Sequence, residues 1–170
     1  MPTITYLALS HPDLMTVPGH IDIRASTSRV WAYLTDLQVV AIVVPHVEAA
    51  WWVTRGLPGV GSVGSGMTTA AGMRLRGSAR ITAWDVEHLL VARAISGMIA
   101  EVAVELRSLG DHTRVRVEAR FVPPGPLALF RRATRTRAHI VVGEALENLR
   151  AEIMNREYTR HATGTACGSG

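Results

Sequence analysis

GDHTRVRVEARFVPPGPLALFRR, residues 110–132, joins a strand pattern directly to a helix pattern. Over 113–122 apolar and charged residues alternate, which predicts a strand with one buried face and one face in solvent. Pro-Pro-Gly-Pro at 123–126 ends that strand, and apolar residues spaced three or four apart then predict a long amphipathic helix over 127–158. A half-buried strand that leads into such a helix predicts a C-terminal helix packed on a sheet.

The residues upstream predict the rest of that sheet. Alternation predicts a first strand over 20–26, and the hydroxyl groups at 26–28 can cap a helix that carries Trp31. A second apolar turn ends at Pro45, and glycine-bounded runs then predict six strands, over 46–54, 63–71, 73–86, 90–96, 99–108 and 113–122. This order predicts an α+β fold in which a curved antiparallel meander sheet wraps around the long C-terminal helix.

The 170 residues predict one domain with two irregular ends. Residues 1–19 are rich in proline and lack a clear period, so we expect an irregular N-terminal arm, with a short strand at 4–9. Residues 20–158 form the predicted ligand-binding domain. The small, polar residues at 159–170 predict a disordered tail.

The composition excludes several kinds of chemistry. All 18 basic residues are arginine, so neither a Schiff base nor a phosphate-binding P-loop has its lysine. Cys167 has no partner for a disulfide, and the chain contains neither an HExxH metal motif nor a G-x-S-x-G nucleophile motif. We therefore expect no cofactor, no bound metal and no covalent nucleophile.

The chain also lacks the signals of a membrane or nucleic-acid protein. No apolar run is long enough to span a bilayer, and the N-terminus resembles no signal peptide, so we expect a cytoplasmic protein without a membrane span. The arginines alternate with apolar residues and have no aromatic residues between them, which argues against nucleic-acid binding.

A glycine-rich segment matches the spacing of a dinucleotide-binding loop. Gly59, Gly61 and Gly64 fall at G-x-G-x-x-G, but that motif needs a helix after it, and the following residues predict a strand. We therefore interpret the segment as a hairpin turn, with the glycine-lined edge of a binding site as the alternative.

Two stretches resemble the Bet v 1-like, or START-related, superfamily, and within it the bacterial polyketide cyclase/dehydrase and lipid-transport group. In VWAYLTDLQVVAIVVPHVE, residues 30–48, V-W, L-x-D and a proline follow in the family's order; in residues 110–132 the match is G-x-T-R-V followed by G-P-L. The likeness covers about residues 20–157. It implies a helix-grip fold with an elongated hydrophobic cavity. The chain departs from the pattern at Val43, often aromatic in the family, and at His46, often glycine.

Period-two alternation assigns one face of each strand to the helix, and many residues on that face are small. Small residues below a helix indicate either close approach of the helix or an open cavity, and the resemblance favours the cavity. Arg93 and Glu101 are assigned to the opposite face. The predicted ligand-binding residues are Trp52, Thr68, Ala70, Leu75, Ala92, Ala94, Ser96, Val102, Val104, Ala119, Phe121, Phe130, Thr134 and Val141.

Two residues are candidates for proton transfer. Imidazole is the side-chain group best suited to proton transfer near neutral pH, so His46 is a candidate for an aldol condensation or an enolisation, and Tyr33 could direct its hydroxyl group into the mouth of the cavity. The alternative for His46 is an ordinary surface histidine at the start of a strand. Trp31 is interpreted as a packing residue.

Two further features predict contacts between proteins. Trp51 and Trp52 point to opposite faces of one strand, so one of them is either exposed or covered by another element. We expect Trp52 inside and Trp51 in contact with the N-terminal arm or with a second subunit, and a homodimer is one prediction. The basic cluster Arg131, Arg132 and Arg135 is either a solvated face or a docking surface for an acidic acyl carrier protein.

The leading hypothesis is a polyketide cyclase or aromatase that binds a hydrophobic polyketide or aromatic intermediate and promotes its cyclisation and dehydration in secondary metabolite biosynthesis. The alternatives are a non-catalytic carrier or sensor of a lipid, quinone or aromatic metabolite, and a partner-binding stress or assembly factor.

Overall fold

A computed structural model describes residues 14–70, 73–123 and 130–164, with side chains for 14–69, 74–123 and 130–155. The strand expected at 4–9 and the first helical residues expected at 127–129 lie outside these ranges. The elements are β1 (Met15–Ile23), α1 (Thr27–Thr35), α2 (Leu37–Val43), β2 (Val47–Trp52), β3 (Val63–Ala70), β4 (Met73–Asp85), β5 (Leu89–Ser96), β6 (Ala100–Ser108), β7 (Thr113–Phe121) and α3 (Arg131–Gly164).

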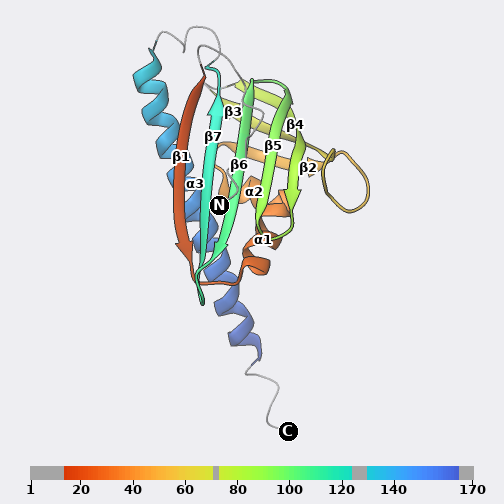
Figure 1. Ribbon diagram of the computed structural model, residues 1–170, viewed down its shortest axis with the longest axis vertical. Coiled ribbons are helices and arrows are strands. Elements are labelled where there is room, and N and C mark those ends of the chain that lie inside the picture. Colours follow the sequence, from red (N-terminus) through yellow and green to blue (C-terminus); the bar gives the residue numbers. More distant parts are fainter. Residues whose placement is uncertain (1–13, 71–72, 124–129, 165–170) are drawn as a thin grey trace.

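The seven strands form one antiparallel sheet in the order β1-β7-β6-β5-β4-β3-β2. Strands β2 to β7 follow one another as the predicted meander, and β1 pairs with the last strand, so β1 and β2 are the two edges. Helix α3 runs behind the sheet beside β1, and α1 and α2 lie behind its other half (Figure 1). This is the helix-grip fold of the α+β class that the sequence predicts.

Two predicted boundaries are wrong. The first strand begins at Met15 rather than at residue 20, so residues 15–19 belong to the sheet and not to an irregular arm. Pro18 obscured this alternation, but an edge strand tolerates proline because its outer N–H groups have no ladder partner. At the other end α3 continues to Gly164, so residues 159–164 are helical and not part of a tail.

The glycine-rich segment joins two antiparallel strands and therefore forms a hairpin connection, as expected. Strands β2 and β3 pair along their length, and the connection between them closes with hydrogen bonds from the amides of Val53 and Thr54 to the carbonyl of Val63. No helix follows the loop, so the described structure lacks the strand–loop–helix unit that a dinucleotide needs.

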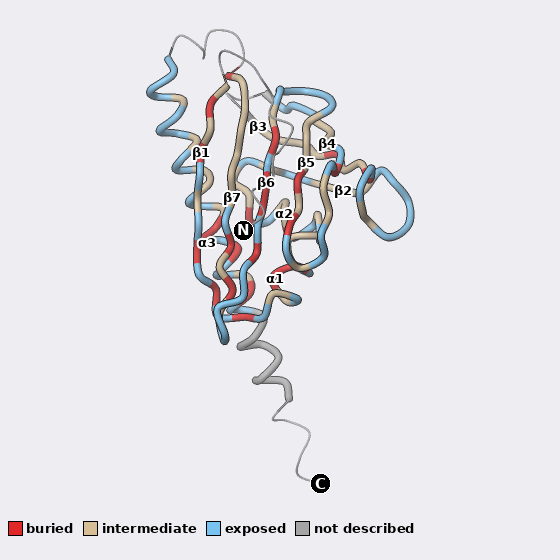
Figure 2. Tube along the Cα trace, in the orientation of Figure 1, coloured by how far each residue is buried: buried red, intermediate tan, exposed pale blue. Residues whose placement is uncertain are grey.

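The buried core occupies one end of the sheet. Near this end residues from β1, β6 and β7 pack against all three helices, and Trp31 lies edge-to-face on Trp84 with ring centroids 5.1 Å apart, as its packing role predicts. Figure 2 shows buried residues along the strands and at α1, with mostly exposed residues on the α3 half beside the start of β1. The core cluster consists of Ile21, Ile23, Ala25, Val30, Trp31, Val39, Val43, Val104, Leu106, Val115, Leu146, Leu149 and Ile153.

Gly19 lets α3 approach β1 closely. A Cβ atom at this position would lie 2.6 Å from Cγ1 of Val142 and 3.0 Å from Cδ1 of Leu146. The β-branched valine cannot easily rotate away from such a clash. Gly19 therefore sets the distance between the edge strand and the helix.

Gly19→Ala is expected to lower the free energy of unfolding by about 1–3 kcal/mol, the usual cost of overpacking. Urea unfolding measures this loss. Gly143→Ala is the matched control, because Gly143 lies in α3 next to Val142 and a Cβ atom there meets nothing within 4 Å. Alanine should raise stability at that helical position by up to about 1 kcal/mol. Equal unfolding midpoints for Gly19→Ala and the parent would show that the helix does not press on β1.

Candidate functional site

The register of the sheet defines which residues share the face below the helices. Val104 of β6 and Val115 of β7 belong to the helix-packed core, so this face is the concave one. Val102 is two residues from Val104 on the same strand and therefore lies on the same face. It pairs with Ala119 on one side and with Ala92 on the other, so these two alanines also lie on that face. The strands thus place most of the predicted lining residues on the concave face.

The concave face is open at the end away from the core. Val102, on a central strand, is 37% exposed, and Leu75 is 45% exposed, although both face the helix side of the sheet. A central, inward-facing valine is normally covered completely in a packed domain. We name as the open apolar surface the concave-face residues Leu75, Ala92, Ala94, Val102, Ala119 and Phe121, all exposed or half-buried.

Helix α3 leaves this surface open because its described buried side chains lie in its middle turns. Leu146, Leu149 and Ile153 are buried in the core, whereas Ile140 is 44% exposed and Phe130 is 64% exposed. The helix passes over β1 at Gly19 and does not lie along the middle strands. The space over the central strands is therefore not filled by the helix.

Two predicted lining residues are placed differently by the structure. Val104 is 8% exposed within the core cluster, so it packs against the closed end rather than lining the open surface. The register shifts between Ala94 and Ser96, and Ser96 pairs with Ser78, whose hydroxyl group contacts that of Ser65 on the convex side. This bulge interrupts the alternation on which the assignment of Ser96 to the concave face rested.

Of the remaining predicted lining residues, Trp52 and Thr68 belong to the concave face near the β2 edge. Trp52 lies beside Gly64 on the concave face, and Thr68 donates its hydroxyl hydrogen to the carbonyl oxygen of His46 at 2.8 Å. Thr134 and Val141 are half-buried on α3. The side chain of Ala70 lies outside the described part.

His46 has an unusual backbone at the edge of the site. Its φ of 67° lies in the left-handed region, where glycine is normal, and this is the position at which the resembling family often carries glycine. The carbonyl of this residue accepts hydrogen bonds from the hydroxyl group of Thr68 and the amide of Thr69. Its Nε2 atom is 3.5 Å from Nη2 of Arg137 on α3. The imidazole is exposed and therefore accessible to a ligand.

The contact between His46 and Arg137 closes one side of the open surface. His46 precedes β2, one edge of the sheet, while Gly19 of β1, the other edge, lies under the same helix. The sheet therefore curls until both of its edges meet α3. The open apolar surface lies inside this curl, with His46 at its rim.

Tyr33 lies elsewhere. It is half-buried on α1 and packs against the closed core cluster. The sequence placed Tyr33 at the mouth of the cavity, whereas the structure brings it together with the core rather than with the rim at His46.

The convex face carries the charged residues that the alternation assigned to it. Trp51 is 37% exposed there and lies under the guanidinium of Arg76, 5.5 Å from its ring centroid, so its described contact is a cation–π pair. Next to it the hydroxyl of Thr69 and then the guanidinium of Arg74 bind the carboxylate of Glu48 and hold its pKa below its usual range.

One charged residue on this face is buried, which alternation did not predict. Glu101 is 3% exposed; its Oε2 accepts a hydrogen bond of 2.7 Å from Arg93, and Arg120 lies 3.6 Å from its other oxygen. Arg93 and Glu101 thus lie on the convex face, opposite Val102 and Val104. Because its charge is paired with arginines of the two neighbouring strands, we interpret Glu101 as a residue that favours the observed strand register and not as a catalytic residue.

The fold and the open apolar surface define a helix-grip protein of the Bet v 1-like, START-related class. The chain belongs to the polyketide cyclase/dehydrase and lipid transport family, whose model matches residues 15–153. This family suggests a hydrophobic ligand. A comparison of this chain with the curated proteins found no match. In the described part of the chain no helix has the length and hydropathy to cross a membrane.

Solved structures share the fold at low sequence identity. TTHA0849 from Thermus thermophilus superposes with a TM-score of 0.73 at 20% identity, covering 84% of this chain and 99% of that one. The Zhui aromatase/cyclase from Streptomyces sp. R1128 gives a TM-score of 0.66 at 18% identity, covering 84% and 95%. A START superfamily protein from Mycobacterium smegmatis gives 0.67 at 13% identity, covering 82% and 97%.

Proposed function

We propose that this protein binds a hydrophobic polyketide or aromatic intermediate on the open apolar surface and promotes its cyclisation and dehydration in the cytoplasm, as part of secondary metabolite biosynthesis. The observation that carries the proposal is the exposure of Val102 and Leu75 on the inner face of the sheet. Exposed apolar area inside a curved sheet is costly in water and is covered when an apolar ligand binds. The solved aromatase/cyclase of the same fold supports this class of reaction.

The chemistry needs little more than a shaped surface and one base. A poly-ketone folded against the sheet has its reacting carbons held together, which supplies most of the rate enhancement. The imidazole of His46 removes a proton from a methylene group between two carbonyl groups, and the resulting enolate carbon attacks a second carbonyl carbon. The proton then returns to the alkoxide, and loss of water completes the new double bond.

The other proposed ligand contacts are polar handles and packing residues. Trp52 packs against an aromatic ring. The hydroxyl hydrogen of Thr68 is donated to the carbonyl of His46, so its oxygen accepts a hydrogen bond from a hydroxyl group of the ligand. Tyr33 takes part only if the ligand reaches the core end of the sheet. The delivery of a tethered substrate is assigned to an acyl carrier protein, which the basic residues Arg131, Arg132 and Arg135 attract.

Rate measurements with His46→Asn test the proposal. Asparagine tolerates the left-handed backbone, so this variant removes the imidazole without adding strain. Cyclisation of a carrier-bound poly-ketone should slow by about 10²–10⁴-fold, the usual contribution of general acid–base catalysis. Binding of the neutral probe N-phenyl-1-naphthylamine should stay unchanged. A His46→Asn variant that cyclises the substrate at the parental rate would remove His46 from the mechanism.

The alternative is a non-catalytic carrier of a lipid, quinone or aromatic metabolite, and the almost wholly apolar character of the open surface favours it. Native mass spectrometry of freshly purified protein separates the two functions. A stoichiometric fatty acid, phospholipid or quinone supports the carrier, whereas an aromatic polyketide supports the cyclase.

A further inference from the structure

The connection between β2 and β3, residues 53–62, exposes apolar side chains. Leu57 is 96% exposed, Val60 is 68% exposed and Val53 is 53% exposed. Figure 1 shows this connection as a loop that projects beyond the sheet, on the side away from α3. Single exposed apolar residues are common on protein surfaces, but several in one short projecting loop indicate a surface that is covered when a partner binds.

This loop is held in a fixed shape by its own hydrogen bonds. At its two ends the amide of Val53 donates to the carbonyl of Val63 at 2.8 Å. Ser62 is buried, its hydroxyl group accepts a hydrogen bond of 3.0 Å from the amide of Gly59, and its carbonyl accepts one of 2.9 Å from the amide of Ile81. A partner that covers the tip therefore does not have to order the loop first.

The same part of the chain carries positive charge without negative charge. From 49 to 84 the sequence contains four arginines and neither aspartate nor glutamate. Arg74 pairs with Glu48, which precedes this stretch. Arg55 and Arg80 are exposed, and among the described residues no carboxylate pairs with either of them. The loop therefore combines apolar side chains with cations whose charge is not neutralised.

The register of the sheet places Arg80 at the base of the loop. Val53 lies opposite Val63, and Val63 pairs with Arg80, so these three residues form one row across β2, β3 and β4. The tip of the loop extends beyond this row. We name as the loop surface the residues Val53, Arg55, Leu57, Val60 and Arg80.

We propose that the loop surface docks on an anionic lipid membrane, with Leu57 and Val60 among the acyl chains and Arg80 at the level of the headgroups. Four residues separate Leu57 from Val53, which gives the tip a reach of at most about 14 Å, and apolar groups of peripheral proteins enter a membrane to a depth of about 5–10 Å. The negative potential of an anionic leaflet attracts basic residues near its surface. An apolar tip with cations behind it follows the order of acyl chains and charged headgroups in a leaflet, which a flat interface between two proteins does not require.

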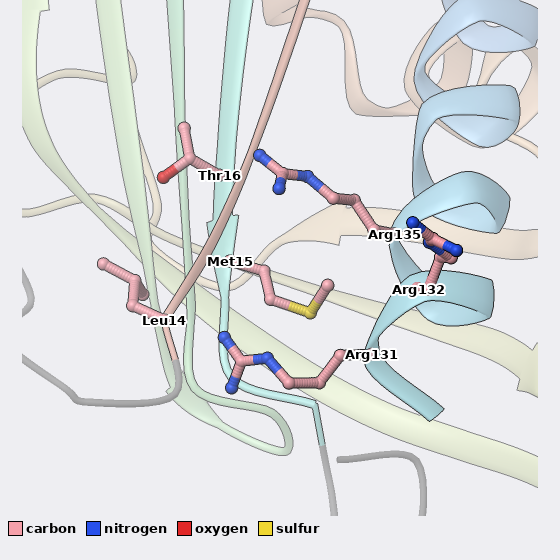
Figure 3. A pocket seen from close by; sticks show the side chains of 6 residues that line it. All are labelled: Leu14, Met15, Thr16, Arg131, Arg132 and Arg135. Carbon is pink, nitrogen blue, oxygen red and sulfur yellow. The ribbon is translucent and has the colours of Figure 1, made fainter. Parts of the chain in front are cut away.

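The other group of arginines is not part of the loop surface. Arg131 and Arg135 lie at a pocket between α3 and β1 and extend toward β1, with the side chain of Met15 between them (Figure 3). Because β1 and β2 are the opposite edges of the sheet, this group and the loop surface are separate. A local docking surface can therefore be distinguished from a general attraction by reversing single charges at different places.

Co-sedimentation with phospholipid vesicles tests the proposal and does not depend on which ligand the concave face binds. The parent protein should bind vesicles of equimolar phosphatidylglycerol and phosphatidylcholine at least about tenfold more tightly than vesicles of phosphatidylcholine, because each basic residue near an anionic leaflet raises the affinity about fivefold. Equal affinities for the two kinds of vesicle, or no binding to either, would overturn the proposal.

Leu57→Ala should weaken binding to the anionic vesicles about tenfold or more, because less apolar surface enters the membrane. Leu109→Ala is the matched control, since it makes the same substitution at a 40% exposed position in the connection between β6 and β7. This control should bind like the parent. Parental binding of Leu57→Ala, or an equal loss in Leu109→Ala, would overturn the proposal.

Arg55→Glu should likewise weaken binding to the anionic vesicles about tenfold or more, because it replaces an attractive charge with a repulsive one. Arg107→Glu makes the same change at an exposed position near the end of β6 and should bind more tightly than Arg55→Glu. Equal losses for these two variants would show a general attraction between the net charge and the membrane, and would overturn the proposal.

Discussion

Val102→Arg is expected to weaken the binding of the neutral probe N-phenyl-1-naphthylamine by about a hundredfold or more. Val102 lies in the middle of the open apolar surface and is 37% exposed. An arginine there keeps its charge in water while the surface is free, but an apolar ligand that covers the surface has to desolvate it. Burial of an unpaired charge costs several kcal/mol, and each 1.4 kcal/mol is about a factor of ten in affinity. Fluorescence titration gives the two dissociation constants.

Val60→Arg is the control for this experiment, since it makes the same substitution at a 68% exposed position in the connection between β2 and β3. Probe affinity should not change in this variant. Equal losses at both positions would indicate a general effect of added charge, and an unchanged affinity of Val102→Arg would place the apolar ligand elsewhere. Urea unfolding of both variants shows whether either has lost its fold.

Ile153→Ala is expected to lower the free energy of unfolding by about 2–5 kcal/mol, the range for removing a fully buried isoleucine side chain. Ile153 is completely buried, and the backbone carbonyl of this residue also accepts a hydrogen bond of 3.1 Å from the guanidinium of Arg29. Because α3 is held mainly by its middle turns, a cavity there weakens the attachment of the whole helix. Urea unfolding monitored by tryptophan fluorescence measures the change.

The same substitution at Ile140, which is 44% exposed on the same helix, should change stability by less than about 0.5 kcal/mol. The contrast between the two isoleucines tests whether the helix is less tightly packed at Ile140 than at its buried middle turns. Comparable losses at both positions would mean that Ile140 is also packed against the sheet, and that the surface beside it is closed.

The architecture could be predicted from sequence because local signals agree with it. Alternation in β7 and β6, the glycines between strands and the long apolar stripe of the last helix all specify one antiparallel sheet with one helix. Alternation failed where the backbone departs from a regular ladder. The bulge between Ala94 and Ser96 resets the faces, and Pro18 disguised the start of β1.

The candidate site was predicted less completely, because exposure depends on where a helix lies and not on strand periodicity. Val102 and Val104 have the same residue type and the same face, yet α3 leaves the first open while the second is buried in the core. Burial of Glu101 likewise depends on Arg93 and Arg120, which neighbouring strands bring to it. The sequence did single out His46, because the family often has glycine at this position. In the structure this residue has a left-handed backbone.

The most direct test of the open apolar surface as the ligand site is the set of intermolecular NOEs between N-phenyl-1-naphthylamine and the methyl groups of the isotopically labelled protein. We expect NOEs to the methyl groups of Val102, Leu75 and Ala92, which lie on three different strands and share only the concave face. NOEs confined to Leu57 and Val60 in the β2–β3 connection, with none to the concave-face methyl groups, would contradict the assignment of this surface as the binding site.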